Sequence, residues 1–215
     1  MAAIQRRLPA YDKRQLRRQI MELAWPAVIE NLLVMSVGIA DTAMVGRLGS
    51  ASLAAVDLAN RLVMFALAVF SAILIGTTAV VARSIGAGDT KTANQALRQA
   101  LIMVTGLGLP FIVLGTIFAK DCLSFMMILQ ESPDLQVINA GTEYMQITIP
   151  FMICALLMMT INSCLRGAGD TRTPMIVTGI SNVVNIVGNY FLIFGKGPFP
   201  AMGVAGAAWS TNLAR

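Results

Sequence analysis

The stretch WPAVIENLLVMSVGIADTAMVG occupies residues 25–46 and decides the fold class. Only Glu30 and Asp41 carry a charge within it, and the other positions are mostly apolar. A helix needs about 20 predominantly apolar residues to cross the hydrocarbon core of a bilayer. The stretch therefore predicts a membrane-spanning helix over about residues 23–45.

The composition of the whole chain agrees with a membrane protein. Of 215 residues, 56% are hydrophobic and 13% are charged, and the mean hydropathy is +0.71, whereas soluble domains carry about 25% charged residues. The chain has no histidine and only three cysteines, without the spacing of a metal site. We expect neither an enzyme nor a cofactor-binding protein, and we attribute the net charge of +5 to membrane topology rather than to nucleic-acid binding.

Further apolar segments predict an all-α, polytopic membrane helix bundle. After a basic N-terminal segment, 1–22, and the first span, the expected spans cover about 52–82, 92–119, 137–164, 174–195 and 203–215. At a rise of about 1.5 Å per residue, the last segment is too short to cross a bilayer, so we expect an incomplete sixth helix.

Basic residues are distributed unevenly between the predicted loops. With the N-terminus in the cytoplasm, eleven lie on that side and four on the other. The cytoplasmic ones are Arg6, Arg7, Lys13, Arg14, Arg17, Arg18, Arg83, Lys91, Arg98, Arg166 and Arg172, and the outer ones are Arg47, Arg61, Lys120 and Lys196. Because cytoplasmic loops carry an excess of Lys and Arg, we expect the N-terminus inside.

One motif occurs twice, as GAGDTKT at residues 86–92 and GAGDTRT at 167–173. A phosphate-binding loop would require GxxxxGK[ST] or a strand followed by GxGxxG, and neither pattern is present. Glycine commonly ends a helix, and Asp and Thr commonly cap the next one. Both copies are therefore predicted to be cytoplasmic turns between helices, with Thr173 as the N-cap before Pro174 at the first helical position.

Polar side chains inside the predicted spans are the candidate functional residues, because such groups are costly in lipid. Glu30 and Asp41 are eleven residues apart, which places them within about 20° of the same helix face and about 16 Å apart along the axis. They form an interior stripe, or else lie at the two interfaces. Pro26 interrupts the backbone bonding of this helix and permits a bend.

The fifth span contains three amides, Asn182, Asn185 and Asn189, at steps of three and four residues, so they share one face. Amide oxygens next to a carboxylate suit a small hard cation, or a hydrogen-bond network around a proton-carrying acid. Amides also form interhelical hydrogen bonds in many membrane bundles. The residues alone leave these interpretations open, and Asn162 and Thr211 are further candidates for the same interior.

Several stretches in the same order resemble the N-terminal half of a transporter of the MATE (multidrug and toxic compound extrusion) family. They are the opening stretch, ARSIGAGDTKTANQALRQAL (82–101), LRGAGDTRTPM (165–175), NVVNIVGNYFLIFG (182–195) and MGVAGAAWST (202–211). The resemblance implies a six-helix lobe of a twelve-helix exporter in the bacterial inner membrane. Influx of Na⁺ or H⁺ would drive efflux of cationic or amphipathic compounds.

The resemblance also implies roles for individual residues. Asp41 would carry the coupling ion, with Asn185, Asn189 and Thr211 as partners and no other metal or cofactor. Pro26 would be the hinge, and Glu30, Asn162 and Asn182 would belong to the cavity and its coupling.

The length departs from the family pattern, because alternating access needs two lobes. The lobe is expected to pair with a missing C-lobe or a second copy. A non-transporting fragment or assembly subunit is one alternative. A flippase for lipid-linked precursors is another, but the interior charges placed from the sequence are acidic, which favours cationic cargo.

Overall fold

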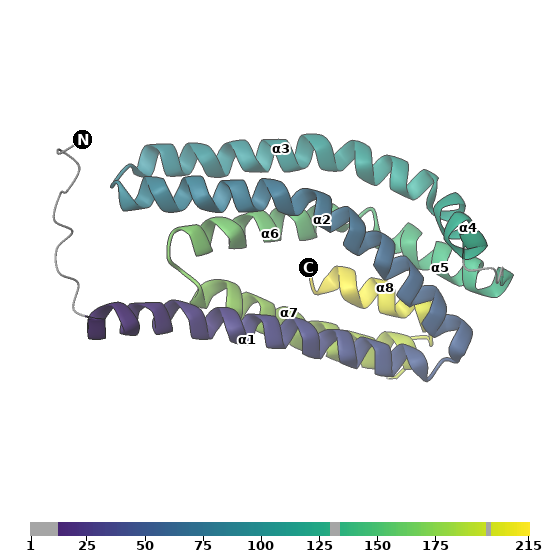
Figure 1. Cartoon of the computed structure of the whole chain (residues 1–215). Helices are drawn as coiled ribbons and strands as arrows, with labels where there is room; N and C mark the ends of the chain where they lie inside the picture. The colour runs from purple at the N-terminus through teal and green to yellow at the C-terminus, as the bar shows by residue number, and fades with distance from the viewer. Residues whose placement is uncertain (1–12, 130–133, 197–198) are drawn as a thin grey trace, which may run out of the picture.

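The computed structural model describes residues 13–129, 134–196 and 199–215. All regular structure in these ranges is helical (Figure 1). The helices are α1 (Lys13–Gly46), α2 (Ser50–Gly86), α3 (Thr90–Ile117), α4 (Ala119–Leu129), α5 (Leu135–Thr148), α6 (Met152–Gly167), α7 (Arg172–Phe194) and α8 (Gly203–Leu213). The predicted all-α class is confirmed, while residues 1–12, with Arg6 and Arg7, lie outside the described residues.

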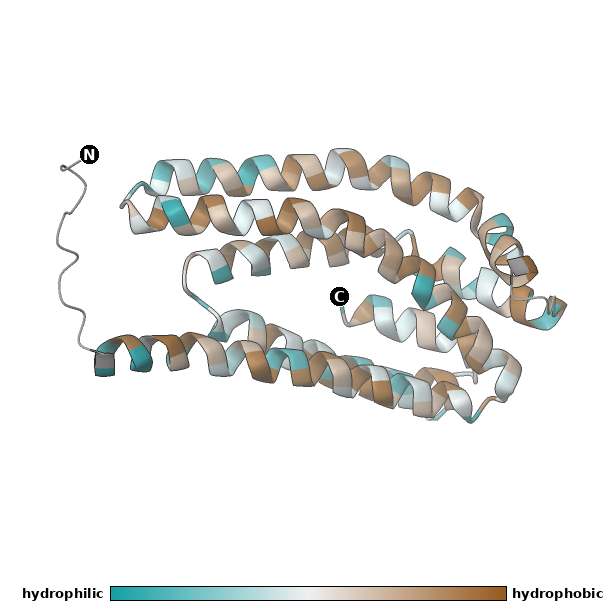
Figure 2. Cartoon of the chain, in the orientation of Figure 1, coloured by the Kyte–Doolittle hydropathy of each residue, from teal (hydrophilic) through white to brown (hydrophobic). Residues whose placement is uncertain are grey.

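Four of these helices, α1, α2, α3 and α7, are long and apolar enough to cross a membrane. Figure 2 shows hydrophobic residues predominating along the middle parts of α2 and α3. The pair α5 and α6 passes the same test as one span bent by 56°. The single helix expected over 137–164 is therefore two helices, because Pro150 lies in the break and proline has no N–H to continue a helix.

The first helix begins earlier than its apolar stretch. α1 starts at Lys13, so the basic segment predicted to precede the helix is helical from that residue onward. Arg18 donates from Nε to Glu22 Oε1 at 2.9 Å, one turn along, a spacing that supports helices at their exposed ends. The charged first turns of α1 thus continue the helix beyond the apolar segment.

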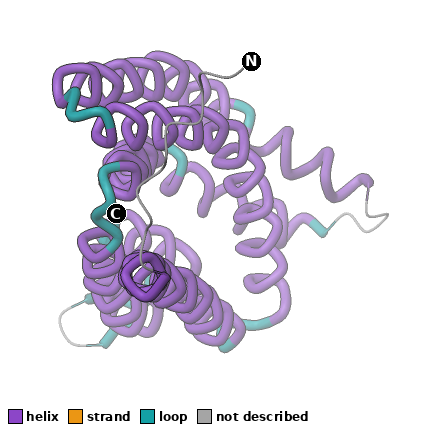
Figure 3. The backbone as a smooth tube through the Cα atoms, turned by 60° about the vertical axis from the view of Figure 1, so that its left-hand side comes forward, coloured by secondary structure: helices purple, strands orange, loops and turns teal. Residues whose placement is uncertain are grey.

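The helices form two groups. α1 runs along α7, whereas α2 packs against α3, α5 and α6; Figures 1 and 3 show the two groups from different directions. α8 packs against α7 and α5 and also touches α1. The start of α1, the α2–α3 loop and the α6–α7 loop lie at the same end of the bundle (Figure 1), so both GAGDT copies are on one side of the membrane.

Each GAGDT copy ends a helix in the same way. Gly88 and Gly169 have φ values of +74° and +90°, which glycine adopts without steric cost. The N–H of the following aspartate, Asp89 or Asp170, donates to the carbonyl five residues earlier, at 2.9 Å in both copies. This is the Schellman arrangement that satisfies the last carbonyls of a helix, so the prediction of a helix-ending turn is confirmed.

The same aspartates begin the next helices. Asp89 accepts from the Thr92 N–H at 3.0 Å, and Asp170 accepts from the Thr173 N–H at 3.0 Å. Hydrogen bonds from the Thr92 and Thr173 side chains, and then from backbone N–H groups, hold the pKa values of the two carboxyl groups below their usual range. The prediction of Thr173 as the N-cap is wrong: Thr173 lies inside α7, because the Asp170 side chain already accepts from the Arg172 and Thr173 N–H groups.

The two copies differ in their surroundings. At Gly167, an added Cβ would lie 2.8 Å from the Thr78 carbonyl oxygen of α2, whereas at Gly86 nothing lies within 4 Å. The close approach at Gly167 accompanies polar contacts between α2 and α6, where Ser163 Oγ donates to the Leu74 carbonyl at 2.8 Å. Small residues let membrane helices approach closely enough for such bonds.

We therefore expect Gly167→Ala to lower the free energy of unfolding by about 1–3 kcal/mol, the usual cost of overpacking. Thermal unfolding in detergent, followed by tryptophan fluorescence, measures the change. Gly86→Ala is the matched control, since it occupies the same place in the other copy and should not be destabilising. Equal losses for the two variants would contradict the role assigned to the α2–α6 contact.

Candidate functional site

The predicted cation residues lie together where α1, α7 and α8 meet. Asn189 Nδ2 donates to Asp41 Oδ1 at 2.5 Å and to Asn185 Oδ1 at 3.1 Å. Asn185 Nδ2 in turn donates to Thr211 Oγ1 at 3.3 Å. Residues up to 170 positions apart in the sequence thus form one continuous hydrogen-bonded chain across three helices.

Close packing of α7 on α8 brings these side chains within reach. An added Cβ at Gly188 would lie 2.5 Å from Ser210 Oγ, and one at Gly206 would lie 2.5 Å from the Leu192 carbonyl oxygen. Ser210 Oγ uses this proximity to donate to the Asn185 carbonyl at 2.7 Å. The two glycines therefore position the amide stripe against Thr211, which is one residue after Ser210.

Asn189 leaves one strong acceptor unused. The residue is only 1% exposed, and both hydrogen bonds that involve its side chain are donated by Nδ2. Its buried Oδ1 has no hydrogen-bond partner among the described residues. Because an unpaired buried carbonyl oxygen is costly, this atom is suited to a bound cation or a water molecule beside Asp41.

Tyr144 of α5 is a member of this interior that the sequence analysis missed. Its side chain is 4% exposed, its hydroxyl donates to Asn60 Oδ1 at 3.3 Å, and Thr211 and Asp41 are among the groups near it. Glu143 directly precedes Tyr144 but is exposed, so the signal available in the sequence was only an aromatic with a polar tip on a helix, a residue that usually finds a partner when buried.

Arg215 is the second residue that the sequence analysis missed. It follows α8 and lies near enough to Asp41 and Tyr144 to interact with both electrostatically. The interior charges of the lobe are therefore not only acidic, which corrects the expectation from the sequence. The signal available in the sequence was an arginine close to a run of small apolar residues. Because that run is short, the sequence did not indicate that the arginine lies in the interior.

Glu30 does not lie with Asp41. Its Oε1 accepts from Arg166 Nη1 at 3.0 Å, and the Glu30 side chain is 14% exposed. This ion pair links α1 to α6, between the two groups of helices. Pro26 is buried one turn before Glu30, and α1 continues through it as one helix, so the structure does not test its predicted role as a hinge.

The remaining two candidates have different surroundings. Asn182 Nδ2 donates to the Leu33 carbonyl of α1 at 2.7 Å, which makes it a link between α7 and α1. Asn162 is buried on α6, and no hydrogen bond within the described ranges joins it to the Asp41 group. The structure thus brings together Asp41, Asn185, Asn189 and Thr211, and leaves Asn162, Asn182 and Glu30 outside that chain of bonds.

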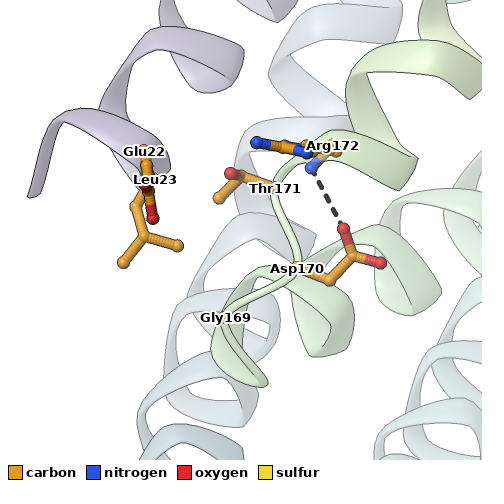
Figure 4. A pocket seen from close by; sticks show the side chains of 6 residues that line it. All are labelled: Glu22, Leu23, Gly169, Asp170, Thr171 and Arg172. Carbon is orange, nitrogen blue, oxygen red and sulfur yellow. Dashed lines mark hydrogen bonds between the residues drawn. The ribbon is translucent and has the colours of Figure 1, made fainter. Parts of the chain in front are cut away.

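A separate cleft of about 490 Å³ lies near the second GAGDT copy. Glu22 and Leu23 line one side, and Gly169, Asp170, Thr171 and Arg172 line the other (Figure 4). Asp170 accepts from the Arg172 N–H at 3.0 Å, as the cap of α7 requires. The polar groups of this cleft therefore serve the helix cap. The cleft lies near the start of α1, whereas Asp41 lies near the end of that helix.

Comparison with known proteins identifies the family. The MatE family model matches residues 26–191, which is most of the chain. The chain belongs to the MatE family. The family consists of transporters, not enzymes, as the sequence led us to expect, and its relatives include multidrug efflux proteins.

Among the most similar curated relatives of this MatE chain is a probable multidrug resistance protein NorM of Thermotoga maritima. It is 34% identical over 97% of the chain and 44% of the relative. An FAD transporter of Shewanella oneidensis is 28% identical over 90% of the chain and 42% of the relative. The chain thus spans less than half the length of the curated relatives that it matches.

Solved structures show the same correspondence. A multidrug resistance MATE family transporter of the MOP superfamily, in an outward-facing conformation, superposes with a TM-score of 0.80 at 28% identity. The match covers 91% of this chain and 42% of that one. The MatE chain therefore has the fold of about half of such a transporter. The lipid-precursor flippase that the sequence left open is not favoured by these matches.

The position of Asn182 predicts a structural role that Asn189 does not share. Asn182→Ala removes the hydrogen bond from the Asn182 amide to the Leu33 carbonyl of α1. The substitution should lower the free energy of unfolding by about 0.6–1.7 kcal/mol, which is the average to the maximum for interhelical hydrogen bonds in membranes. Thermal unfolding in detergent measures it. A change in Na⁺ affinity with unchanged stability would contradict this assignment.

Proposed function

We propose that the chain forms the cation-coupling lobe of a multidrug exporter, with Asp41 as the residue that binds Na⁺ or H⁺. The unpaired, buried Oδ1 of Asn189 beside Asp41 is the observation that carries the proposal. It provides an oxygen acceptor where the protein itself offers no donor. A cation or a proton-bearing water at this place would satisfy it.

The oxygen ligands at this place suit a monovalent cation. One carboxylate, Asp41, faces neutral oxygens from Asn185, Asn189 and Thr211. Oxygen ligands of this kind are those that hard cations prefer. Alternatively, Asp41 takes up a proton, and the same amides then hydrogen-bond to the acid. In both cases one positive charge is bound per turnover.

The coupling acts through α1. Asp41 bonds to α7 and Glu30 bonds to α6, so α1 carries a polar contact at two levels with two different helices. A cation at Asp41 competes with the Asn189 donor for the carboxylate. Loss of that bond biases α1, bending near Pro26, toward the conformation that releases cargo outward.

The cargo that we propose is cationic or amphipathic compounds. The support is Asp41 in the interior, together with the relatives named multidrug resistance proteins. One relative is named an FAD transporter, and since FAD carries phosphates, cargo in this family is not restricted to cations.

The lobe operates with a second lobe, which is a C-lobe or a second copy of this lobe. Alternating access requires two repeats moving against each other around a midplane site, and the matched structures are more than twice as long. The eleven-to-four distribution of basic residues supports a cytoplasmic N-terminus, and the bacterial relatives support a bacterial inner-membrane location.

Asp41→Asn tests the cation site directly. The four ligating residues lie in this chain, so the purified protein in detergent should bind ²²Na⁺, or take up protons, without a second lobe. Removal of one partner of a buried charge pair costs about 3–5 kcal/mol, so Na⁺ affinity should fall by more than about 100-fold. Unchanged Na⁺ and proton binding would refute the assignment of Asp41.

Asn189→Ala should have a smaller effect of about tenfold or more on the same affinity, since a hydrogen bond to a charged group contributes about 1.5–3 kcal/mol. Asn182→Ala is the matched control, with the same residue type on the same helix but a bond to Leu33 instead of Asp41. Na⁺ binding and proton uptake, measured separately, then identify the coupling ion. Equal losses for the two asparagine variants would contradict the proposed ligand set.

A further inference from the structure

Arg215 places a positive charge in the interior of the lobe. Its Nη1 is buried and has no hydrogen-bond partner among the described residues. It interacts electrostatically with Asp41, but no ion pair within 4.0 Å joins the two side chains in the part of the chain that the structure describes. The guanidinium is therefore near a carboxylate without being neutralised by contact with it.

Other unpaired polar atoms lie where α5 and α8 meet. The Thr148 side chain is 1% exposed, and its Oγ1 has no hydrogen-bond partner in the described ranges, while Tyr144 is its polar neighbour. Asn212 donates from Nδ2 to the Ile147 carbonyl at 2.8 Å, and its Oδ1 is unpaired. These groups line the contact between α5 and α8, at the break before α6.

The donors among these groups favour an anionic ligand. A buried guanidinium is strongly destabilising unless an anion and hydrogen bonds satisfy it. Its planar fork matches the oxygens of a carboxylate or phosphate. The Thr148 hydroxyl, which like Arg215 lies near Tyr144, is able to donate a hydrogen bond to the same ligand. Asp41 does not fill this role, because no ion pair within 4.0 Å joins its carboxylate to Arg215 in the described ranges.

We propose that Arg215, with Thr148, forms a subsite for a carboxylate or phosphate group of the cargo, next to the cation site at Asp41. The subsite rests on the proposed transport function and names the cargo class more narrowly. A compound that carries an amine and a carboxylate or phosphate places its two charges on two oppositely charged residues. The coupling cation then displaces the amine from Asp41, which is the competition that antiport requires.

A matched pair of probes tests the subsite. The protein is purified with Trp25→Phe, so that Trp209 on α8 is the remaining tryptophan, and is placed in phosphatidylcholine nanodiscs. 3-Phenylpropanoate and 3-phenylpropan-1-ol share a skeleton and differ in the charged group. Since charge-assisted hydrogen bonds are about twice as strong as neutral ones, the carboxylate should bind about tenfold or more tightly than the alcohol, measured by Trp209 fluorescence.

Arg215→Gln should abolish this preference, and Arg215→Lys, which keeps the charge, should retain part of it. Thermal unfolding in the same nanodiscs shows whether Arg215→Gln is folded, and the lysine variant keeps the test valid if it is not. Equal affinity for the two probes, no binding of either probe up to its solubility limit, or a preference that survives in Arg215→Gln would overturn the proposal.

Two further measurements complete the test. One distinguishes an anionic group of the cargo from an anionic lipid, and the other distinguishes the Arg215 subsite from the cation site at Asp41. In nanodiscs that contain phosphatidylglycerol, an unchanged carboxylate preference identifies soluble cargo as the occupant, whereas its loss identifies the anionic lipid headgroup as the occupant and overturns the assignment to cargo. Na⁺ binding is measured in the same preparation. Failure of Na⁺ and proton binding at Asp41 refutes the cation site, whereas failure of the carboxylate preference refutes the Arg215 subsite alone.

Discussion

The carboxylate of Asp41 has to be solvated by the protein, because the surrounding bilayer offers no hydrogen bonds. Asn189 provides the donor, and Asn185 and Thr211 continue the chain of bonds. This requirement explains the close packing of α7 on α8. Without glycine at 188 and 206 the two helices would be pushed apart, and the amides would lose Thr211.

The repeated GAGDT motif solves a second problem of the fold. The chain has to reverse direction within a few residues, and no backbone N–H or carbonyl group is to be left unpaired. In each copy the left-handed glycine closes one helix and the aspartate opens the next. The loops are thus alike, but the glycine at 167 also permits contact with α2. A motif that looks functional by its repetition serves the fold.

Much of this fold was predictable because lipid imposes a simple rule on sequence length and polarity. The apolar stretches predicted the long helices, and the spacing of Asn185 and Asn189 predicted one face, which the structure confirms by their mutual bond. Which residues bond to one another across different helices was not predictable. The bond of Asn182 to Leu33, the ion pair of Glu30 and the depth of Arg215 depend on how helices pack, and periodicity within one helix carries no information on that.

The weak burial of α1 gives its polar contacts their importance. In the apolar window of α1 only 6% of residues are buried inside the chain, against 28% for α7. Apolar packing within the lobe therefore holds α1 less firmly than its neighbours, and its bonds through Asp41, Leu33 and Glu30 contribute a larger share. A ligand that competes for one of these bonds needs to offset little packing energy to move the helix. Placing the ionisable residue on the least buried of the four long apolar helices thus makes ion binding and helix position interdependent, as coupling requires.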